Sequence, residues 1–112
     1  MSVYRRAWTM QLNEGSEAAY DAAHAQVWPE MLKQMTASGI IRFFLYRSGT
    51  TVFAFQERNH PFTSSTAPPS DITLRWWREM APLMKTSGED KQPVHTPLDE
   101  VFALDTTTES HT

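Results

Sequence analysis

The sequence of 112 residues contains no cysteine. Without cysteine the chain can form no disulfide bond, no thiolate metal site and no cysteine nucleophile. It also has no run of lysine or arginine, and its net charge is −3, which argues against nucleic acid or an anionic membrane as the main partner. No apolar stretch is long enough to span a membrane or to form the core of a secretory signal. We therefore expect a cytoplasmic protein.

Several catalytic motifs are absent as well. The sequence has no HxH or HExxH spacing for a metal, no glycine-rich nucleotide loop and no GxSxG nucleophile turn. His60 and His95 lie in proline-containing stretches, and His111 lies in the polar C-terminal segment. We therefore expect neither a metal ion nor a cofactor.

Aromatic residues are plentiful for a chain of this length. Four Trp, six Phe and three Tyr are present, together with six Met. Many of these side chains must form the core. Aromatic faces are also what a small protein offers to the apolar face of a sugar or of another ring-shaped ligand.

Hydrophobic periodicity divides the chain into four strands and two helices within a single domain, residues 1–105, followed by a flexible polar tail, residues 106–112. Alternation predicts the strands and a period of 3.6 residues predicts the helices. Pro29 predicts a kink or break in the first helix, and Pro82 limits the second. The expected order is strand 4–12, helix 17–37, strand 40–47, strand 51–57, helix 71–85 and strand 98–105, with loops at 58–70 and 86–97.

This β-α-β-β-α-β order is typical of ferredoxin-like α+β domains. In the second strand Phe43 and Leu45 point to one face of the sheet, and Phe44 and Tyr46 point to the other. Two helices can cover only one of these apolar faces. A second copy is the simplest cover for the other face, so we expect a homodimer packed sheet to sheet, a dimeric α/β barrel.

The stretch "AAYDAAHAQVWPE" raises the first candidate site. Tyr20 and His24 lie one helical turn apart on the same face. An imidazole with a pKa of about 6.5 can give and take a proton at neutral pH. The alternative is that His24 lies at the edge of the core with its hydrogen bonds satisfied and that Tyr20 only packs. Spacing alone leaves both interpretations open.

The stretch "RWWREM" gives a second candidate. Trp76 and Trp77 diverge by about 100° around the helix, and Met80 shares a face with Trp76. These side chains can pack in the core and still form the wall of a cavity between helix and sheet. Packing alone would explain them equally well.

Four stretches together resemble the L-rhamnose mutarotase family: "AWTMQLN", "YDAAHAQVWPEM", "RWWREM" and "PLDEVFALD". They occur in the family's order, from about Tyr4 to Asp105. The resemblance implies a small homodimeric α+β protein that interconverts the α and β anomers of L-rhamnose, or of a related sugar such as L-fucose, without metal or cofactor.

The resemblance also implies roles for individual residues. His24 matches the family's general acid/base histidine, and Tyr20 matches a substrate-binding tyrosine. Trp76 and Trp77 match its substrate-contacting pair, to which we add Met80. Phe43 stands where the family has a second substrate-binding tyrosine, so one hydroxyl is missing. Trp28 is expected to pack rather than to face the sugar.

Three hypotheses follow for the function. The first is a mutarotase for a 6-deoxy sugar with His24 as the general acid/base. The second is a cofactor-free monooxygenase on the same dimeric architecture, which a more apolar pocket around Phe43 would favour. The third is a non-catalytic dimer that binds a monosaccharide or another small molecule.

Overall fold

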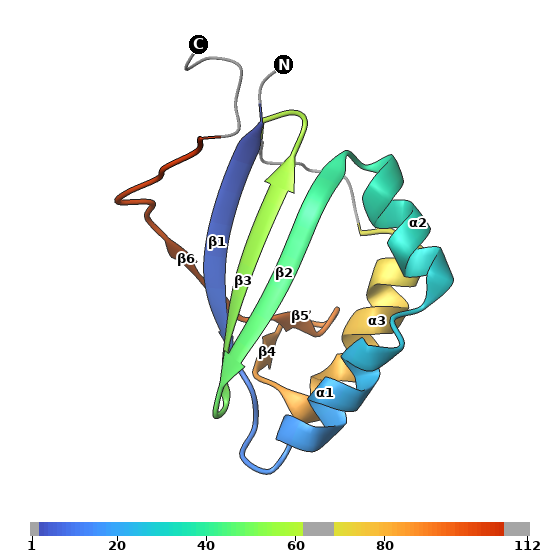
Figure 1. Cartoon of the computed structure of the whole chain (residues 1–112). Helices are drawn as coiled ribbons and strands as arrows, with labels where there is room; N and C mark the ends of the chain where they lie inside the picture. Colours follow the sequence, from blue (N-terminus) through green and yellow to red (C-terminus); the bar gives the residue numbers. More distant parts are fainter. Residues whose placement is uncertain (1–2, 62–68, 107–112) are drawn as a thin grey trace.

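The computed structural model describes residues 3–61 and 69–106 of the chain. Most of the expected loop at 58–70 and of the expected tail at 106–112 lies outside these residues. The elements, drawn in Figure 1, are β1 (Tyr4–Gln11), α1 (Glu17–Ala25), α2 (Pro29–Ala37), β2 (Ile40–Ser48), β3 (Thr51–Arg58), α3 (Asp71–Met80), the 3-10 turn η1 (Ala81–Leu83), β4 (Thr86–Ser87), β5 (Gln92–Pro93) and β6 (His95–Leu98).

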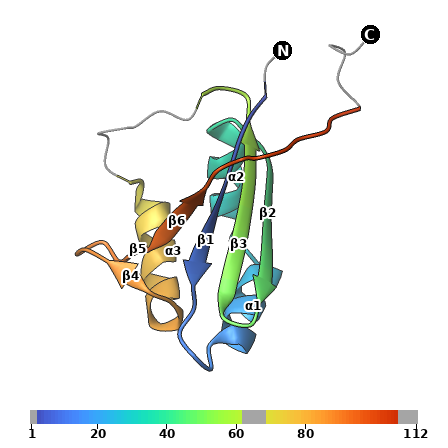
Figure 2. The same ribbon diagram turned by 90° about the vertical axis from the view of Figure 1, so that its left-hand side faces the viewer.

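In the described residues a four-stranded sheet has the order β2-β3-β1-β6, and every neighbouring pair is antiparallel. The three helices lie on one face of this sheet (Figures 1 and 2). The chain is thus a mixed α and β domain with one antiparallel main sheet. A short second pairing, β4 with β5, lies beside α3 at the lower end of the sheet.

The predicted helix over 17–37 is two helices. α1 ends at Ala25, and α2 begins at Pro29. Proline has no N–H to donate to the carbonyl four residues back, but it fits well at the first position of a new helix. The break that Pro29 predicts is therefore present, and it is complete. It turns the chain between the two helices while both remain on the same face of the sheet.

Local signals explain the other boundaries. The Ser70 hydroxyl accepts a hydrogen bond from the Thr73 backbone N–H at 3.3 Å and so caps α3. α3 ends at Met80, earlier than the predicted 85, and Pro82 lies in the 3-10 turn that follows. Between α2 and β2, Gly39 has a φ of +95°, and a Cβ there would lie 2.5 Å from Oδ1 of Asn59 and 2.5 Å from Cε1 of His60. Only glycine fits this connection.

The last strand lies earlier in the chain than the predicted strand over 98–105. β6 spans His95–Leu98, whereas residues 99–105, predicted as strand, pair with no strand in the described part of the chain. Pro93 and Pro97 made this region look like a loop. Pro97 is tolerated because β6 is an edge strand, where a missing N–H can face away from the neighbour.

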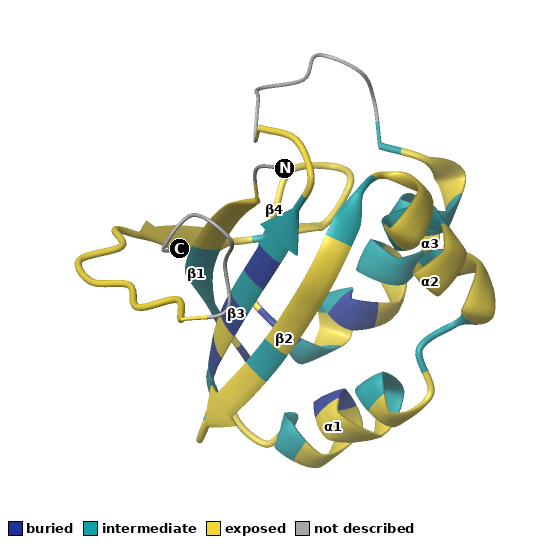
Figure 3. Cartoon of the chain, turned by 45° about the horizontal axis from the view of Figure 1, so that its top comes forward, coloured by how far each residue is buried: buried dark blue, intermediate teal, exposed yellow. Residues whose placement is uncertain are grey.

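The helices cover one face of the sheet and leave the other face open. Val52, Ala54 and Gln56 point toward the helices and are buried. On the opposite face Phe44 stacks against Phe55 with ring centroids 6.2 Å apart. Phe44 and its neighbours Tyr46 and Phe53 are exposed to solvent. Figure 3 shows long exposed stretches on β2. The alternation predicted for β2 and β3 is therefore correct, and one apolar face of the sheet is open in the single chain.

The buried core is small and lies at one end of the domain, where β1 ends and α1 and η1 meet the sheet. Its members are fully or almost fully buried apolar side chains: Leu12, Tyr20, Val52, Met80 and Met84. Toward the other end of the sheet the helices and strands separate around a cavity. A core of this size stabilises a single chain only modestly.

Candidate functional site

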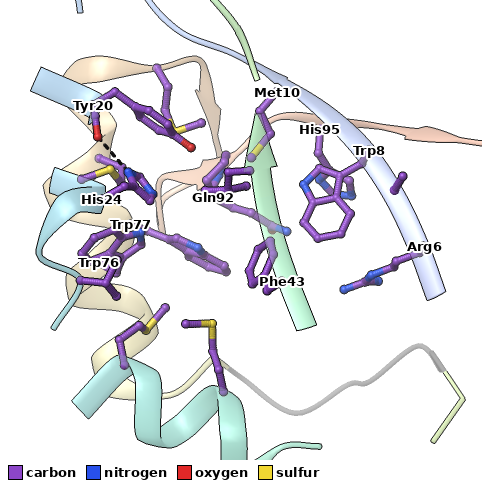
Figure 4. Close-up of a pocket in the computed structure, with 18 of the residues that line it drawn as sticks. Arg6, Trp8, Met10, Tyr20, His24, Phe43, Trp76, Trp77, Gln92 and His95 are labelled. Atoms are coloured by element: carbon purple, nitrogen blue, oxygen red, sulfur yellow. Dashed lines mark hydrogen bonds between the residues drawn. The ribbon is translucent and has the colours of Figure 1, made fainter. Parts of the chain in front are cut away.

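A cavity of about 710 Å³ lies between the sheet and the three helices. Its lining is predominantly aromatic and aliphatic, with a few polar groups, as is common in sites for small molecules. All six residues that the sequence analysis singled out line it, as Figure 4 shows in part: Tyr20, His24, Phe43, Trp76, Trp77 and Met80. Five of them come from the inner faces of α1 and α3, and Phe43 comes from β2.

The imidazole of His24 lies between two other rings. Its centroid is 4.2 Å from that of Tyr20, one turn earlier on α1, with the ring planes tilted by 33°. On its other side Trp76 of α3 meets it edge to face at 5.3 Å. These contacts restrict the rotation of the imidazole and hold it at the cavity wall.

A hydrogen bond decides which nitrogen of His24 can act on a ligand. Nδ1 lies 2.9 Å from the backbone carbonyl oxygen of Tyr20. A carbonyl oxygen only accepts, so Nδ1 carries the proton and donates it. Nε2 is then the nitrogen that can take a proton from a ligand, and in the imidazolium it can return that proton.

Tyr20 cannot act as a second base near neutral pH. Burial first, and then the negative charge of Asp21, raises the pKa of Tyr20 to about 12. The phenol therefore keeps its proton under ordinary conditions and can donate a hydrogen bond. A positioning or binding role follows from this, and proton abstraction does not.

The raised pKa of Tyr20 predicts a pH dependence of stability. In an unfolded chain the pKa of a tyrosine is about 10. The native state favours the neutral phenol, so this contribution is complete below about pH 10 and is lost as the pH rises through about 12. We expect the free energy of unfolding of wild type to fall relative to that of Tyr20→Phe over this interval, as measured by urea denaturation at a series of pH values. Parallel curves for the two proteins would contradict the raised pKa.

An ion pair attaches the outer side of α1 to the sheet. Arg47 on β2 donates from Nε and Nη2 to the two carboxylate oxygens of Asp21, at 2.9 and 2.6 Å. The hydrogen bond from Arg47 lowers the pKa of Asp21. Because Asp21 follows Tyr20 directly, this bidentate contact helps to set the position of α1, and with it that of His24.

Trp28 lies behind the cavity wall. Its ring meets Trp76 edge to face at 5.0 Å, and the Arg75 guanidinium lies over it at 5.4 Å. Arg75 also lies 3.9 Å from Glu30. Trp28 thus supports the wall that Trp76 forms, in agreement with the packing role expected for it.

Phe43 lies on the sheet side of the cavity, on β2. Its ring centroid is 5.8 Å from that of Trp8 on β1, so the two rings form one apolar wall. Tyr46 belongs to the opposite face of the sheet, where its side chain is 64% exposed. Tyr46 therefore does not replace the hydroxyl that Phe43 lacks.

The far wall of the cavity contains polar residues that the sequence analysis did not select. Arg6 and Trp8 come from β1, where the guanidinium lies 5.0 Å from the indole ring. Gln92 of β5 and His95 of β6 line the same wall (Figure 4). His95 pairs directly with Met10 across the two strands. The alternation in 4–12 predicted a strand but no site residue on it, and His95 was expected in a loop.

In the residues that the structure describes, no group of three or more His, Asp or Glu side chains is arranged to hold a metal ion. No helix in this part of the chain is long and apolar enough to cross a membrane.

Comparison with known proteins identifies the family. The family model described as L-rhamnose mutarotase matches residues 5–104. The L-rhamnose mutarotase of Paraburkholderia phytofirmans is 37% identical over 88% of this chain and 92% of its own, and that of Bacteroides thetaiotaomicron is 35% identical over 90% and 98%. A crystal structure of L-rhamnose mutarotase from Formosa agariphila has a TM-score of 0.77 at 33% identity, covering 91% of this chain and 99% of that one. The chain belongs to the L-rhamnose mutarotase family.

Proposed function

We propose that this protein interconverts the α and β anomers of L-rhamnose, or of a closely related 6-deoxy sugar, in the cavity around His24. Membership of the family supports the reaction. The observation that carries the proposal is the orientation of His24, whose Nδ1 donates to the Tyr20 carbonyl so that Nε2 is left for the sugar.

The chemistry needs one mobile proton. Nε2 of His24 takes the proton of the anomeric hydroxyl as that oxygen forms a carbonyl bond to C1. The C1–O5 bond breaks, its electron pair goes to the ring oxygen, and the imidazolium gives the proton to that oxygen. After rotation about C1–C2, the reverse steps close the ring on the other carbonyl face. General acid/base assistance of this kind contributes about 10²–10⁴-fold.

The remaining lining suits a deoxysugar. Trp76, Trp77 and Met80 offer an apolar surface to the methyl group and to the C–H face of the ring. The protonated phenol of Tyr20 can donate to a sugar oxygen. Phe43 has no hydroxyl to bind a sugar oxygen, and its ring extends the apolar wall.

We also propose the finer architecture expected from the sequence. The strand order and directions support a ferredoxin-like arrangement. The open face with Phe44, Tyr46, Phe53 and Phe55 supports a homodimer in which two such faces pack together as a dimeric α/β barrel. A cytoplasmic location remains our expectation.

Polarimetry on freshly dissolved single anomers tests the proposed activity. L-rhamnose and L-fucose are compared with D-glucose, each with and without enzyme. We expect the protein to accelerate the change in rotation for L-rhamnose or L-fucose more than for D-glucose. A change in tryptophan fluorescence on binding, without acceleration for any sugar, would support the non-catalytic alternative instead.

Restoring a hydroxyl at position 43 gives a specific prediction. In the Phe43→Tyr variant the phenol is expected to reach a sugar oxygen and to tighten L-rhamnose binding by about 2- to 10-fold, the range of one net hydrogen bond. Fluorescence titration of wild type and variant measures the two dissociation constants. Unchanged or weaker binding would argue that Phe43 does not contact the sugar.

A further inference from the structure

The cavity is larger than one sugar ring requires. Its volume of about 710 Å³ lies in the range of about 300–1,000 Å³ that is typical of sites for drug-sized ligands, which are larger than a single pyranose. His24 and Tyr20 lie at one side of the cavity and Arg6 and Trp8 at the other, with Phe43 between them (Figure 4). A monosaccharide held against His24 therefore leaves the side next to Arg6 for another group.

Arg6 brings a positive charge to this side of the cavity. It pairs across the strands with Gln56, which is 5% exposed and points toward the helices, so the Arg6 side chain lies on the same inner face of the sheet. Its Cζ atom lies 5.0 Å from the centroid of the Trp8 ring. An arginine stacked on an indole keeps the N–H groups at its edge for a planar anion, which it can bind through two parallel hydrogen bonds.

The surroundings of Arg6 favour an anionic ligand. Burial first, and then the positive charge of Arg58, lowers the pKa of Arg6. Arg58 is held at this end of the sheet by a hydrogen bond from its Nη2 to the Ser38 carbonyl oxygen at 2.8 Å. An arginine stays protonated in proteins, so two positive charges act on the same region. A carboxylate bound at Arg6 would offset both the loss of water and the repulsion between the two guanidinium groups.

The orientation of the sugar in the proposed reaction decides which of its atoms face Arg6. O1 and O5 must both lie within reach of His24, so the edge of the ring formed by C1 and O5 faces α1. The opposite edge of a pyranose consists of C3 and C4. The methyl group is attached to C5, beside the ring oxygen, and stays near Trp76 and Trp77. The hydroxyls on C3 and C4 are thus directed toward the side of the cavity that Trp8 and Arg6 line.

We propose that the cavity accepts a reducing disaccharide in which a uronic acid is attached to O3 or O4 of the 6-deoxy sugar, with its carboxylate on Arg6 and its ring against Trp8 and Phe43. The anomeric hydroxyl of the reducing unit stays free and lies at His24, so the same proton transfer applies to it. This inference rests on the proposed function and extends its substrate class from neutral monosaccharides to acidic disaccharides.

Two pairs of disaccharides test the role of the charge. D-glucuronic acid and D-glucose are each linked to O4 and to O3 of L-rhamnose, so that within a pair only the carboxylate differs. We expect wild type to bind at least one acidic disaccharide about 10- to 100-fold more tightly than its glucosyl counterpart, the range for hydrogen bonds to charged groups. Titrations followed by tryptophan fluorescence measure the dissociation constants.

Substitutions separate Arg6 from the overall charge of the protein. In Arg6→Gln the acidic and the neutral disaccharide should bind with similar affinity, because the cation is lost while the Trp8 ring remains. Arg6→Lys keeps the charge and should restore part of the preference for the acid. Arg78→Gln removes the same charge from an exposed position on α3, is the matched control, and should keep the preference of wild type.

The possible outcomes separate this inference from the proposed function. Saturation-transfer NMR with wild type measures anomer exchange at the reducing end of each disaccharide and in L-rhamnose. Exchange of L-rhamnose would leave the acidic subsite overturned alone if neither acid binds more tightly than its neutral counterpart, or if Arg6→Gln and Arg78→Gln weaken the preference equally. A preference for the acid that only Arg6→Gln abolishes, without exchange of any sugar, would support the subsite and overturn the proposed mutarotase activity.

Discussion

Replacing His24 with alanine is expected to lower kcat/KM for anomer exchange by about 10²–10⁴-fold, the usual contribution of a positioned general acid/base. In the proposed mechanism His24 is the only residue of the cavity that transfers a proton, and this substitution removes its imidazole. The loss is expected mainly in kcat, because Trp76, Trp77 and Tyr20 still line the cavity and bind the sugar. Polarimetry at several L-rhamnose concentrations separates the two constants.

The matched control is the other imidazole that lines the cavity. His95 lies on the far wall, on β6, and takes no part in the proposed proton transfer. His95→Ala should therefore retain kcat within a small factor of wild type. If the two alanine variants lose activity to the same degree, the special role of His24 is wrong.

Replacing Leu12 with alanine is expected to have the largest effect on stability, a loss of about 2–5 kcal/mol, as for other large-to-small changes in packed cores. Leu12 is 2% exposed, belongs to the small buried cluster and bridges to Met84 beyond η1. The cavity left at this point would separate the end of β1 from the segment that follows α3.

Urea denaturation at one fixed protein concentration measures the change, since the stability of a dimer depends on concentration. Leu32→Ala on α2 removes the same atoms at a position that is 49% exposed. It should cost less than about 1 kcal/mol, because about half of Leu32 is exposed to solvent. Equal losses in the two variants would show that the cluster around Leu12 is not the main core.

Local patterns predicted most of the fold. The alternation in 40–47 and 51–57 identified a hairpin and even the face of each side chain, because strand periodicity is a local property. Pro29 predicted the interruption between α1 and α2 for a similar reason. The last strand was misplaced because His95–Leu98 contains a proline and is held in the sheet by β1, a partner far away in sequence. Residues 99–105 look like a strand, yet they pair with no strand in residues 3–61 and 69–106, which the structure describes.

Some residues of the candidate site could likewise be predicted from local patterns, whereas others depend on contacts that are distant in sequence. Residues on α1 and α3 could be chosen from helical spacing and from the resemblance to a family. Their selection needed no knowledge of tertiary structure. Gln92 and His95 reach the cavity only through the pairing of β6 with β1 and of β5 with β4, which no local pattern contains. The tautomer of His24 likewise depends on a backbone carbonyl whose position is known only from the structure.

The central claim is that the cavity around His24 converts one anomer of L-rhamnose into the other. Saturation-transfer NMR on wild-type protein with L-rhamnose at anomeric equilibrium measures this conversion directly, with L-mannose, which has a hydroxyl on C6, as the comparison sugar. Our account predicts transfer between the two C1 protons well above that in buffer, and stronger transfer for L-rhamnose than for L-mannose because the cavity wall is apolar. Exchange of L-rhamnose anomers at the rate seen in buffer alone would contradict it.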